Sequence, residues 1–229
     1  MNIKKSKQSG FTLVEIAIVL VIIGLLLGGV LKGQEMITSS KVNGTISAME
    51  GYKSAFYAFQ DRYQTVPGDS ATAATLVGNG AINCTANCGD GLITLWTNTS
   101  LVSNHLAASG FYKGPFATVY PNAQPTTLNS AANSFNGALY IGTGLQFSGG
   151  VTAAAGTIAK TYIFSGNNIP SKLMADIDRK IDDGNPLTGS FRNSTLAAAY
   201  NGLTCVNAAF AWETAAGAGG DNCAGAWLL

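Results

Sequence analysis

The residue with the most unusual chemistry in this 229-residue chain is Glu15, a lone carboxylate near the start of an apolar run. The run extends from Phe11 to Leu31 and holds no other charged residue. As a helix it would be roughly 32 Å long, enough to cross the hydrocarbon core of a bilayer. A carboxylate in hydrocarbon costs several kcal/mol unless it is paired. The sequence therefore predicts a cationic partner for Glu15, against the alternative of a solvated side chain at the membrane interface.

The residues before the run, MNIKKSKQSG, are hydrophilic and basic. Because basic flanks stay in the cytoplasm, we expect the remainder of the chain to face outward. Three interpretations of the run compete: a cleaved secretory signal, an ordinary membrane anchor and an anchor that is processed and retained. A secretory signal needs a small-residue cleavage site after the run, and Gly28-Gly29 offers small residues without the A-x-A pattern. An ordinary anchor explains the length of the run but not Glu15.

The stretch SGFTLVE, residues 9–15, resembles the processing signature of type IV prepilins and type II secretion pseudopilins, as do the basic leader and the apolar helix around it. In that family a membrane peptidase cleaves after the glycine, here Gly10, and methylates the new terminal amine, here that of Phe11. The resemblance implies that this amine meets the Glu15 carboxylate of a neighbouring subunit during assembly. Such a pair would set the axial stagger, because any other stagger leaves both charges buried alone.

The resemblance also implies a domain organisation and a function. Residues 1–10 would be a leader removed by the peptidase, 11–63 a stem helix that spans the membrane over 11–31, and 64–229 a globular head. The chain would be a structural subunit of a type IV pilus or a type II secretion pseudopilus, and not an enzyme. Its partners would be other pilins or pseudopilins, the prepilin peptidase and methyltransferase, an inner-membrane platform protein and an assembly ATPase. It would begin in the bacterial inner membrane with its head in the periplasm, and end in the filament.

Composition leaves two other classes of function open. Charged residues make up 11% of the chain and the formal net charge is +1, so no nucleic-acid patch is indicated. A membrane-anchored extracytoplasmic binding protein that does not polymerise is the main alternative, and a secreted hydrolase with a cleaved signal is the other. His105 is the only histidine, and without a convincing Ser or Cys partner it suits packing or capping better than catalysis.

Four cysteines follow the apolar run, an even number that indicates disulfides in an oxidising compartment. Of the three pairings that four cysteines allow, we favour the local pairs Cys84–Cys88 and Cys205–Cys223. The second pair would close a C-terminal loop and contribute about 3 kcal/mol through chain entropy. A zinc site of four thiolates is the alternative, but the paired C-x₂-C spacing that is usual for it is absent.

Three aspartates, Asp178, Asp182 and Asp183, lie close together in the sequence. Hard cations bind clustered carboxylates, so these residues are a candidate calcium site. Their spacing is not that of a D-x-[DN]-x-[DN]-G loop, and Arg179 and Lys180 supply counter-charge. The default interpretation is therefore a solvated helix end and turn, with no metal or other cofactor.

The pattern of apolar residues along the chain predicts an α+β fold. The resemblance implies that this fold is pilin-like, with a long N-terminal helix packed on a small antiparallel sheet and with additional short helices. The long helix would be apolar all round in its first half, amphipathic in its second half, and would end before Pro67-Gly68. Its aromatic residues would fill the interface with the head: Tyr52, Phe56, Tyr57, Phe59 and Tyr63.

Shorter elements are predicted from apolar periodicity and from Gly and Pro positions. Two further helices are expected, one over residues 92–109 and one from Pro170 to about Asp183. Strands are expected over 138–141 and 145–147, on either side of a Gly-Thr-Gly turn at 142–144, and over 158–164.

Overall fold

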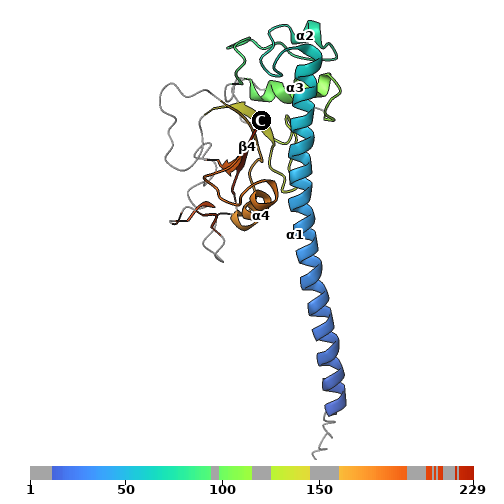
Figure 1. The fold of residues 1–229 in the computed structure, drawn as a ribbon. Coiled ribbons are helices and arrows are strands. Elements are labelled where there is room, and N and C mark those ends of the chain that lie inside the picture. The colour runs from blue at the N-terminus through green and yellow to red at the C-terminus, as the bar shows by residue number, and fades with distance from the viewer. Residues whose placement is uncertain are drawn as a thin grey trace, which may run out of the picture. The chain divides into compact units, whose positions relative to one another are not determined.

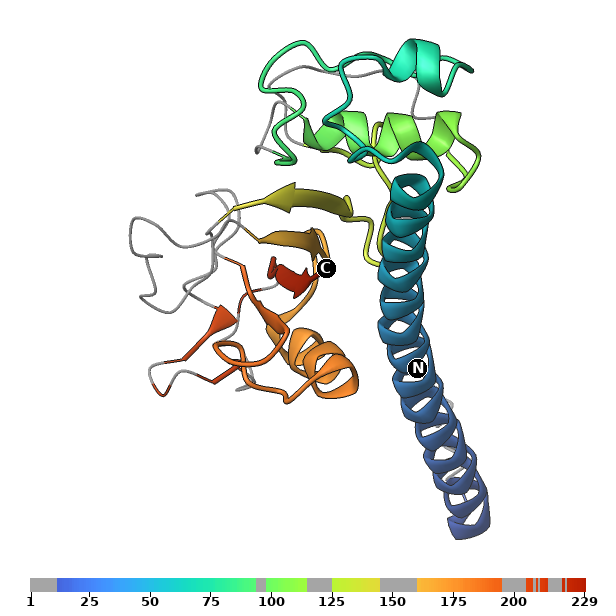
Figure 2. The same ribbon diagram turned by 45° about the horizontal axis from the view of Figure 1, so that its top comes forward.

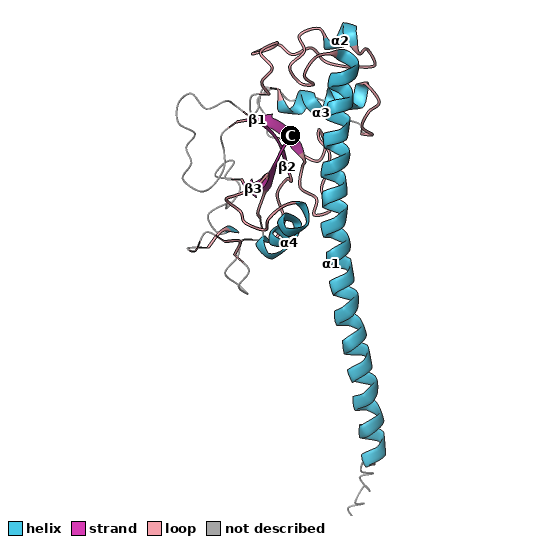
Figure 3. Cartoon of the chain, in the orientation of Figure 1, coloured by secondary structure: helices cyan, strands magenta, loops and turns pink. Residues whose placement is uncertain are grey.

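The computed structural model describes residues 12–93, 98–114, 125–144, 160–194, 205–207, 209, 211–213, 220 and 222–229. The chain forms two compact units, Met1–Ser40 and Lys41–Leu229. The helices are α1 (Leu13–Tyr63), α2 (Ala73–Leu76), α3 (Thr99–Ala108) and α4 (Ser171–Ile181), and the strands are β1 (Tyr140–Thr143), β2 (Thr161–Phe164), β3 (Phe191–Asn193) and β4 (Gly225–Leu228) (Figures 1 and 3). This α+β arrangement, with a long N-terminal helix, a small antiparallel sheet and short helices, confirms the predicted fold class.

The second half of α1 is amphipathic, as predicted, and belongs to the same compact unit as the sheet. Its buried side chains recur at steps of mainly three and four residues, which places them on one face of the helix. They are Val42, Thr45, Met49, Tyr52, Ala55, Phe56 and Phe59. This face packs into one hydrophobic core together with residues of α3, the sheet and α4.

The four-stranded sheet has the order β1-β2-β4-β3, and each neighbouring pair is antiparallel. The last strand of the chain, β4, thus lies between β2 and β3. Lys53 of α1 reaches this strand: its Nζ donates to the Leu228 carbonyl at 3.1 Å and lies 4.6 Å from the centre of the Trp227 ring. Strand β4 therefore pairs with two strands of the sheet and also contacts the second half of α1.

A buried chain of hydroxyl groups connects α1 with α3 and the segment before β1. The Tyr52 hydroxyl lies 2.5 Å from Ser103 Oγ, which lies 2.9 Å from Ser130 Oγ. Ser130 in turn donates to the Leu139 carbonyl. Burial raises the pKa of Tyr52 to about 12, against the opposing effect of the serine hydrogen bonds, so the phenol stays protonated.

The predicted aromatic interface is confirmed for four of its five residues: Tyr52, Phe56 and Phe59 are buried, and Tyr63 is partly buried and packs against the same core. Tyr57 is the exception, because it is 44% exposed. The predicted third helix is also confirmed. Pro170 occupies its N-cap position and α4 then buries one apolar face.

Two predicted elements differ from the structure. The second helix was expected from Leu92, but α3 begins at Thr99, and residues 94–97 lie outside the described part. Ile93 is not helical because its backbone pairs sideways with Thr143: the Thr143 N–H donates to the Ile93 carbonyl at 2.7 Å, and the Ile93 N–H donates to Thr143 Oγ1 at 3.0 Å.

The expected turn at Gly142–Gly144 is wrong. Gly142 and Thr143 belong to β1, where they lie opposite Tyr162 and Thr161 of β2. The strand predicted over 145–147 falls outside the described residues. The third strand prediction is confirmed in its described part, as β2.

Candidate functional site

Glu15 lies in the first turn of α1, and its carboxylate folds back over the start of the helix. The backbone N–H and the hydroxyl of Thr12 both donate to Glu15 Oε2, at 2.8 and 2.9 Å. The Glu15 N–H donates in return to Thr12 Oγ1 at 3.3 Å. This reciprocal pattern is a capping box, which satisfies backbone donors that have no partner within the helix.

The predicted processing residues, Gly10 and Phe11, lie outside the described residues. The structure does show a role for Thr12, which was not among the residues predicted from the sequence. The spacing Thr12-x-x-Glu15 is a capping-box signature, so the sequence carried the signal. Both Thr12 bonds use the same oxygen of Glu15, and Oε1 accepts no hydrogen bond from any described residue. The capped carboxylate therefore keeps one oxygen for a further donor.

The part of α1 that follows Glu15 is apolar on all sides. Its most apolar 18-residue window has a mean hydropathy of 2.8, and none of that window is buried within the chain. The large apolar side chains between Leu13 and Ile37 are 45–90% exposed. By length and composition this helix could cross a membrane. A helix that is apolar all round needs lipid or other helices around it, because water would solvate it poorly.

Polar residues return to α1 at Lys32, which pairs with Glu35 at 2.7 Å. Both side chains are about 70% exposed (69% and 71%), so the pair contributes little to stability. It marks the point where the surface of the helix changes from apolar to polar.

His105, the only histidine, has a packing role, as the sequence favoured. Its ring is buried in α3, stacks on Phe59 with centroids 5.8 Å apart, and makes two hydrogen bonds. Nδ1 accepts from the Gly68 N–H at 2.9 Å, and Nε2 lies 2.7 Å from the Ile82 carbonyl. A ring that accepts at Nδ1 and donates at Nε2 is neutral. Burial lowers the pKa of His105, while the Ile82 hydrogen bond acts in the opposite direction.

Figure 2 views α3 and the loops around it from a second side. Asp69 organises one of these loops, since its carboxylate accepts from the N–H groups of Gly89 and Gly91, both at 2.8 Å. The disulfide Cys84–Cys88 closes the same loop. The sequence gave no sign of this role for Asp69.

The second disulfide, Cys205–Cys223, joins the segment before β4 to a short hairpin-like stretch. Both disulfides are therefore the local pairs that the sequence favoured. Trp212 lies in the stretch that starts at Cys205, and its Nε1–H donates to Asp178 Oδ2 of α4 at 2.6 Å. The C-terminal segment is in this way bonded to α4.

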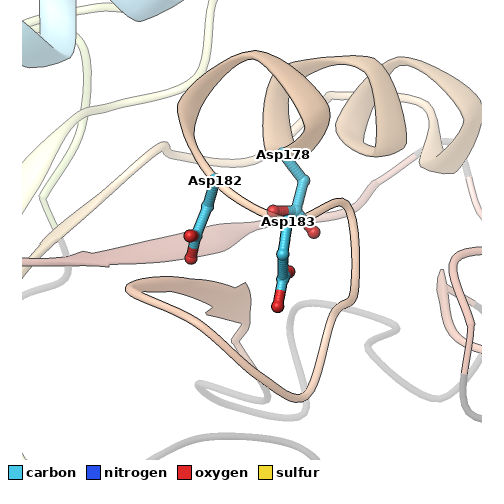
Figure 4. A group of neighbouring side chains, drawn as sticks. All are labelled: Asp178, Asp182 and Asp183. Atoms are coloured by element: carbon cyan, nitrogen blue, oxygen red, sulfur yellow. The ribbon is translucent and has the colours of Figure 1, made fainter.

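The three aspartates of the candidate calcium site come together in the structure. Asp178, Asp182 and Asp183, the acidic cluster, each offer one carboxylate oxygen within 4.8 Å of the others. Asp178 is buried, Asp182 is half-buried and Asp183 is exposed. Figure 4 shows the three side chains close to one another at the end of α4. Carboxylate oxygens at such distances are the ligand type that hard cations prefer.

Comparison with known proteins finds one family model that matches part of the chain. Residues 5–31 match the family model described as the prokaryotic N-terminal methylation motif, which is the prepilin-type cleavage and methylation segment of type IV pilins and pseudopilins. No curated protein and no solved structure matches the chain. The match covers the second part of the predicted leader, the predicted cleavage site, Glu15 and the apolar part of α1.

Proposed function

We propose that this chain, which carries a prepilin-type segment, is a pilin or pseudopilin subunit that polymerises through its N-terminal helix into a type IV pilus or a type II secretion pseudopilus. The match over residues 5–31 carries the proposal. The exposed apolar surface of α1 and the position of Glu15 in its first turn support it.

Assembly would depend on one charge pair for each contact between neighbours. Cleavage after Gly10 creates a terminal amine on Phe11, and methylation leaves that amine positively charged. Because Glu15 Oε1 is not used by Thr12, it is available to the amine of a neighbouring subunit. In an apolar helix bundle, a subunit that lacked one partner would bury a lone charge, at a cost of about 3–5 kcal/mol. Only one stagger of the helices avoids this cost.

The apolar surface of α1 would serve in two surroundings. Before assembly it would contact the acyl chains of the inner membrane, with the head in the periplasm. After assembly it would contact the same surface of other subunits. Prepilin peptidase would process the chain, and an assembly ATPase with its platform protein would move it out of the membrane, as in other members of the pilin class.

Replacement of Glu15 tests the proposal. We expect the Glu15→Ala variant to insert in the membrane and to fold its head normally, but to form no filaments, because a neighbouring amine is left unpaired. Glu35→Ala is the matched control, since Glu35 is an exposed acid of the same helix that lies beyond the apolar stretch. Filaments sheared from cells and the membrane fraction would be compared by immunoblot for both variants. Normal filaments from Glu15→Ala would contradict the proposal and favour a membrane-anchored binding protein that does not polymerise.

A further inference from the structure

A pocket open to solvent lies where the second half of α1 meets the C-terminal strand. Its volume is about 370 Å³, which falls within the range of about 300–1,000 Å³ that is usual for binding pockets. Phe56, Val66, Leu228 and Leu229 contribute apolar groups to it, and Lys160 is the only charged side chain among its described lining residues. This lining suits an apolar side chain better than an ion.

The pocket is held open by contacts on both of its sides. The Leu229 N–H donates to the Thr161 carbonyl at 3.0 Å, and Lys53 Nζ donates to the Leu228 carbonyl at 3.1 Å. Figures 1 and 2 both show the C-terminal end beside α1. Because these contacts form the pocket in advance, little conformational entropy is lost when a group enters it.

Leu128 is the most exposed large apolar side chain among the described residues of the compact unit Lys41–Leu229. It is 79% exposed, whereas Tyr57 and Leu76, which follow it, are each 44% exposed. A single exposed apolar residue is common on a protein surface and needs no partner. Leu128 differs from such residues because the turn that carries it is fixed.

The turn is fixed by hydrogen bonds between Thr126 and the residues that follow it. The Thr126 N–H donates to Asn129 Oδ1 at 2.7 Å, and the Ser130 N–H donates to the Thr126 carbonyl at 2.9 Å. The Leu128 N–H donates to Thr126 Oγ1 at 3.3 Å. Asn129 and Ser130 are each 1% exposed. Buried residues thus anchor a turn that presents Leu128 to solvent in one conformation.

The segment that carries Leu128 and the pocket lie on different flanks of α1. Residues 125–139 reach the helix at Gly44, where a Cβ would lie 2.6 Å from Ser134 Oγ. The pocket uses Tyr57 of the same helix. At 3.6 residues per turn, Gly44 and Tyr57 lie about 140° apart around the helix axis. One subunit could therefore offer its leucine to one neighbour and its pocket to another.

We propose that Leu128 of one subunit enters this pocket of the next subunit, and that the repeated contact joins neighbouring heads along the filament. An exposed apolar side chain that fits a pocket elsewhere on the same molecule makes a head-to-tail contact, and such contacts generate filaments when they do not close into a ring. No charged residue lies between Lys113 and Lys160, so the inserted turn buries no charge. Lys160 is exposed and can keep its ammonium group in water. The proposal rests on the proposed filament function and adds a specific contact to it.

A charge at the tip of the turn would test the contact, because Leu128→Lys brings a second cation to Lys160. We expect it to weaken the contact about tenfold to a hundredfold, as the loss of one buried leucine implies, and to lower the yield of sheared filaments. Lys160→Glu should restore the filaments of Leu128→Lys, because attraction then replaces repulsion. Leu76→Lys, at the exposed leucine of α2, is the matched control and should leave the yield unchanged. Immunoblots of sheared filaments and membranes would measure all four chains.

Cysteine pairs would detect the contact directly, since the native cysteines are all in disulfides. Leu128→Cys combined with Gln60→Cys, which lies in the pocket, should give dimers, trimers and larger species when filaments are oxidised. Such a ladder is the signature of a head-to-tail contact, and each single variant should remain monomeric. Leu76→Cys combined with Gln60→Cys is the matched control and should give no ladder.

Three results would overturn the proposal: undiminished filaments from Leu128→Lys, a defect that Lys160→Glu does not restore, or filaments of the Leu128→Cys and Gln60→Cys chain that give no ladder. Each would assign the pocket to another occupant. The proposed function would survive these results, because Glu15→Ala tests it separately. A parent chain that forms no filaments would overturn both.

Discussion

Thr12 and Glu15 bond to each other in both directions across the first turn of α1, with Thr12 N–H to Glu15 Oε2 at 2.8 Å and Glu15 N–H to Thr12 Oγ1 at 3.3 Å. The residue regarded as an intermolecular charge partner is thus also the cap of its own helix. These roles are compatible, since the cap uses one carboxylate oxygen and leaves the other. The cap holds the carboxylate at the first turn of α1.

Removal of the capping hydroxyl should loosen the start of α1. We expect Thr12→Ala to cost about 1 kcal/mol locally, which corresponds to about fivefold faster amide exchange in the first turn. Thr12→Ser keeps the hydroxyl and should exchange like the parent chain. Hydrogen exchange followed by mass spectrometry of the full chain in detergent would measure both variants. Equal exchange rates for Ala and Ser would show that the cap contributes nothing.

His105 should make the head less stable in mild acid. Its folded pKa is lowered from an unfolded value of about 6.5, because the ring is buried. The unfolded chain therefore binds a proton first, and the free energy of unfolding falls as the pH drops through 6.5 toward the folded pKa. Protonation would also place a hydrogen on Nδ1, where the Gly68 N–H now donates.

Urea unfolding at pH 7.5 and pH 5.5 would measure this effect. The raised pKa of Asp178 acts in the opposite sense over this range, so the parent chain is best compared with His105→Gln, in which Asp178 is unchanged. We expect His105→Gln to be less stable at pH 7.5 and to lose less stability on acidification. An identical pH dependence in both chains would contradict the assignment of a neutral, buried ring.

The two disulfides should differ in their contribution to stability. Cys205 and Cys223 are separated by 18 positions and Cys84 and Cys88 by 4. Chain entropy then assigns about 3 kcal/mol to the longer loop and about 2 kcal/mol to the shorter one. Double replacement of each pair by serine, followed by urea unfolding, would test the order. A larger loss from the shorter loop would indicate that contacts around it outweigh chain entropy.

Elements with long, regular periodicity could be predicted from the sequence. The burial of Val42, Met49 and Phe59 on one face of α1 follows from their spacing, and Pro170 marked the start of α4. The Gly-Thr-Gly stretch was misread because glycine is typical of turns, whereas here the pairing of Gly142 with Tyr162 decides its conformation.

Contacts between distant segments could not be predicted. Asp178 and Trp212 lie 34 positions apart, and Gly68 and His105 lie 37 apart, so no local pattern links them. The acidic cluster was visible as three nearby aspartates, but the burial of Asp178 was not.

The mass of the mature N-terminus tests the central claim most directly. The membrane form and the filament form of the protein would each be digested, and the N-terminal peptide sequenced by mass spectrometry. We expect the mature chain to begin at Phe11 with a methylated amine and to retain the apolar part of α1 through Leu31. A mature chain that keeps the leader MNIKKSKQSG, or that begins beyond Gly29, would contradict the account.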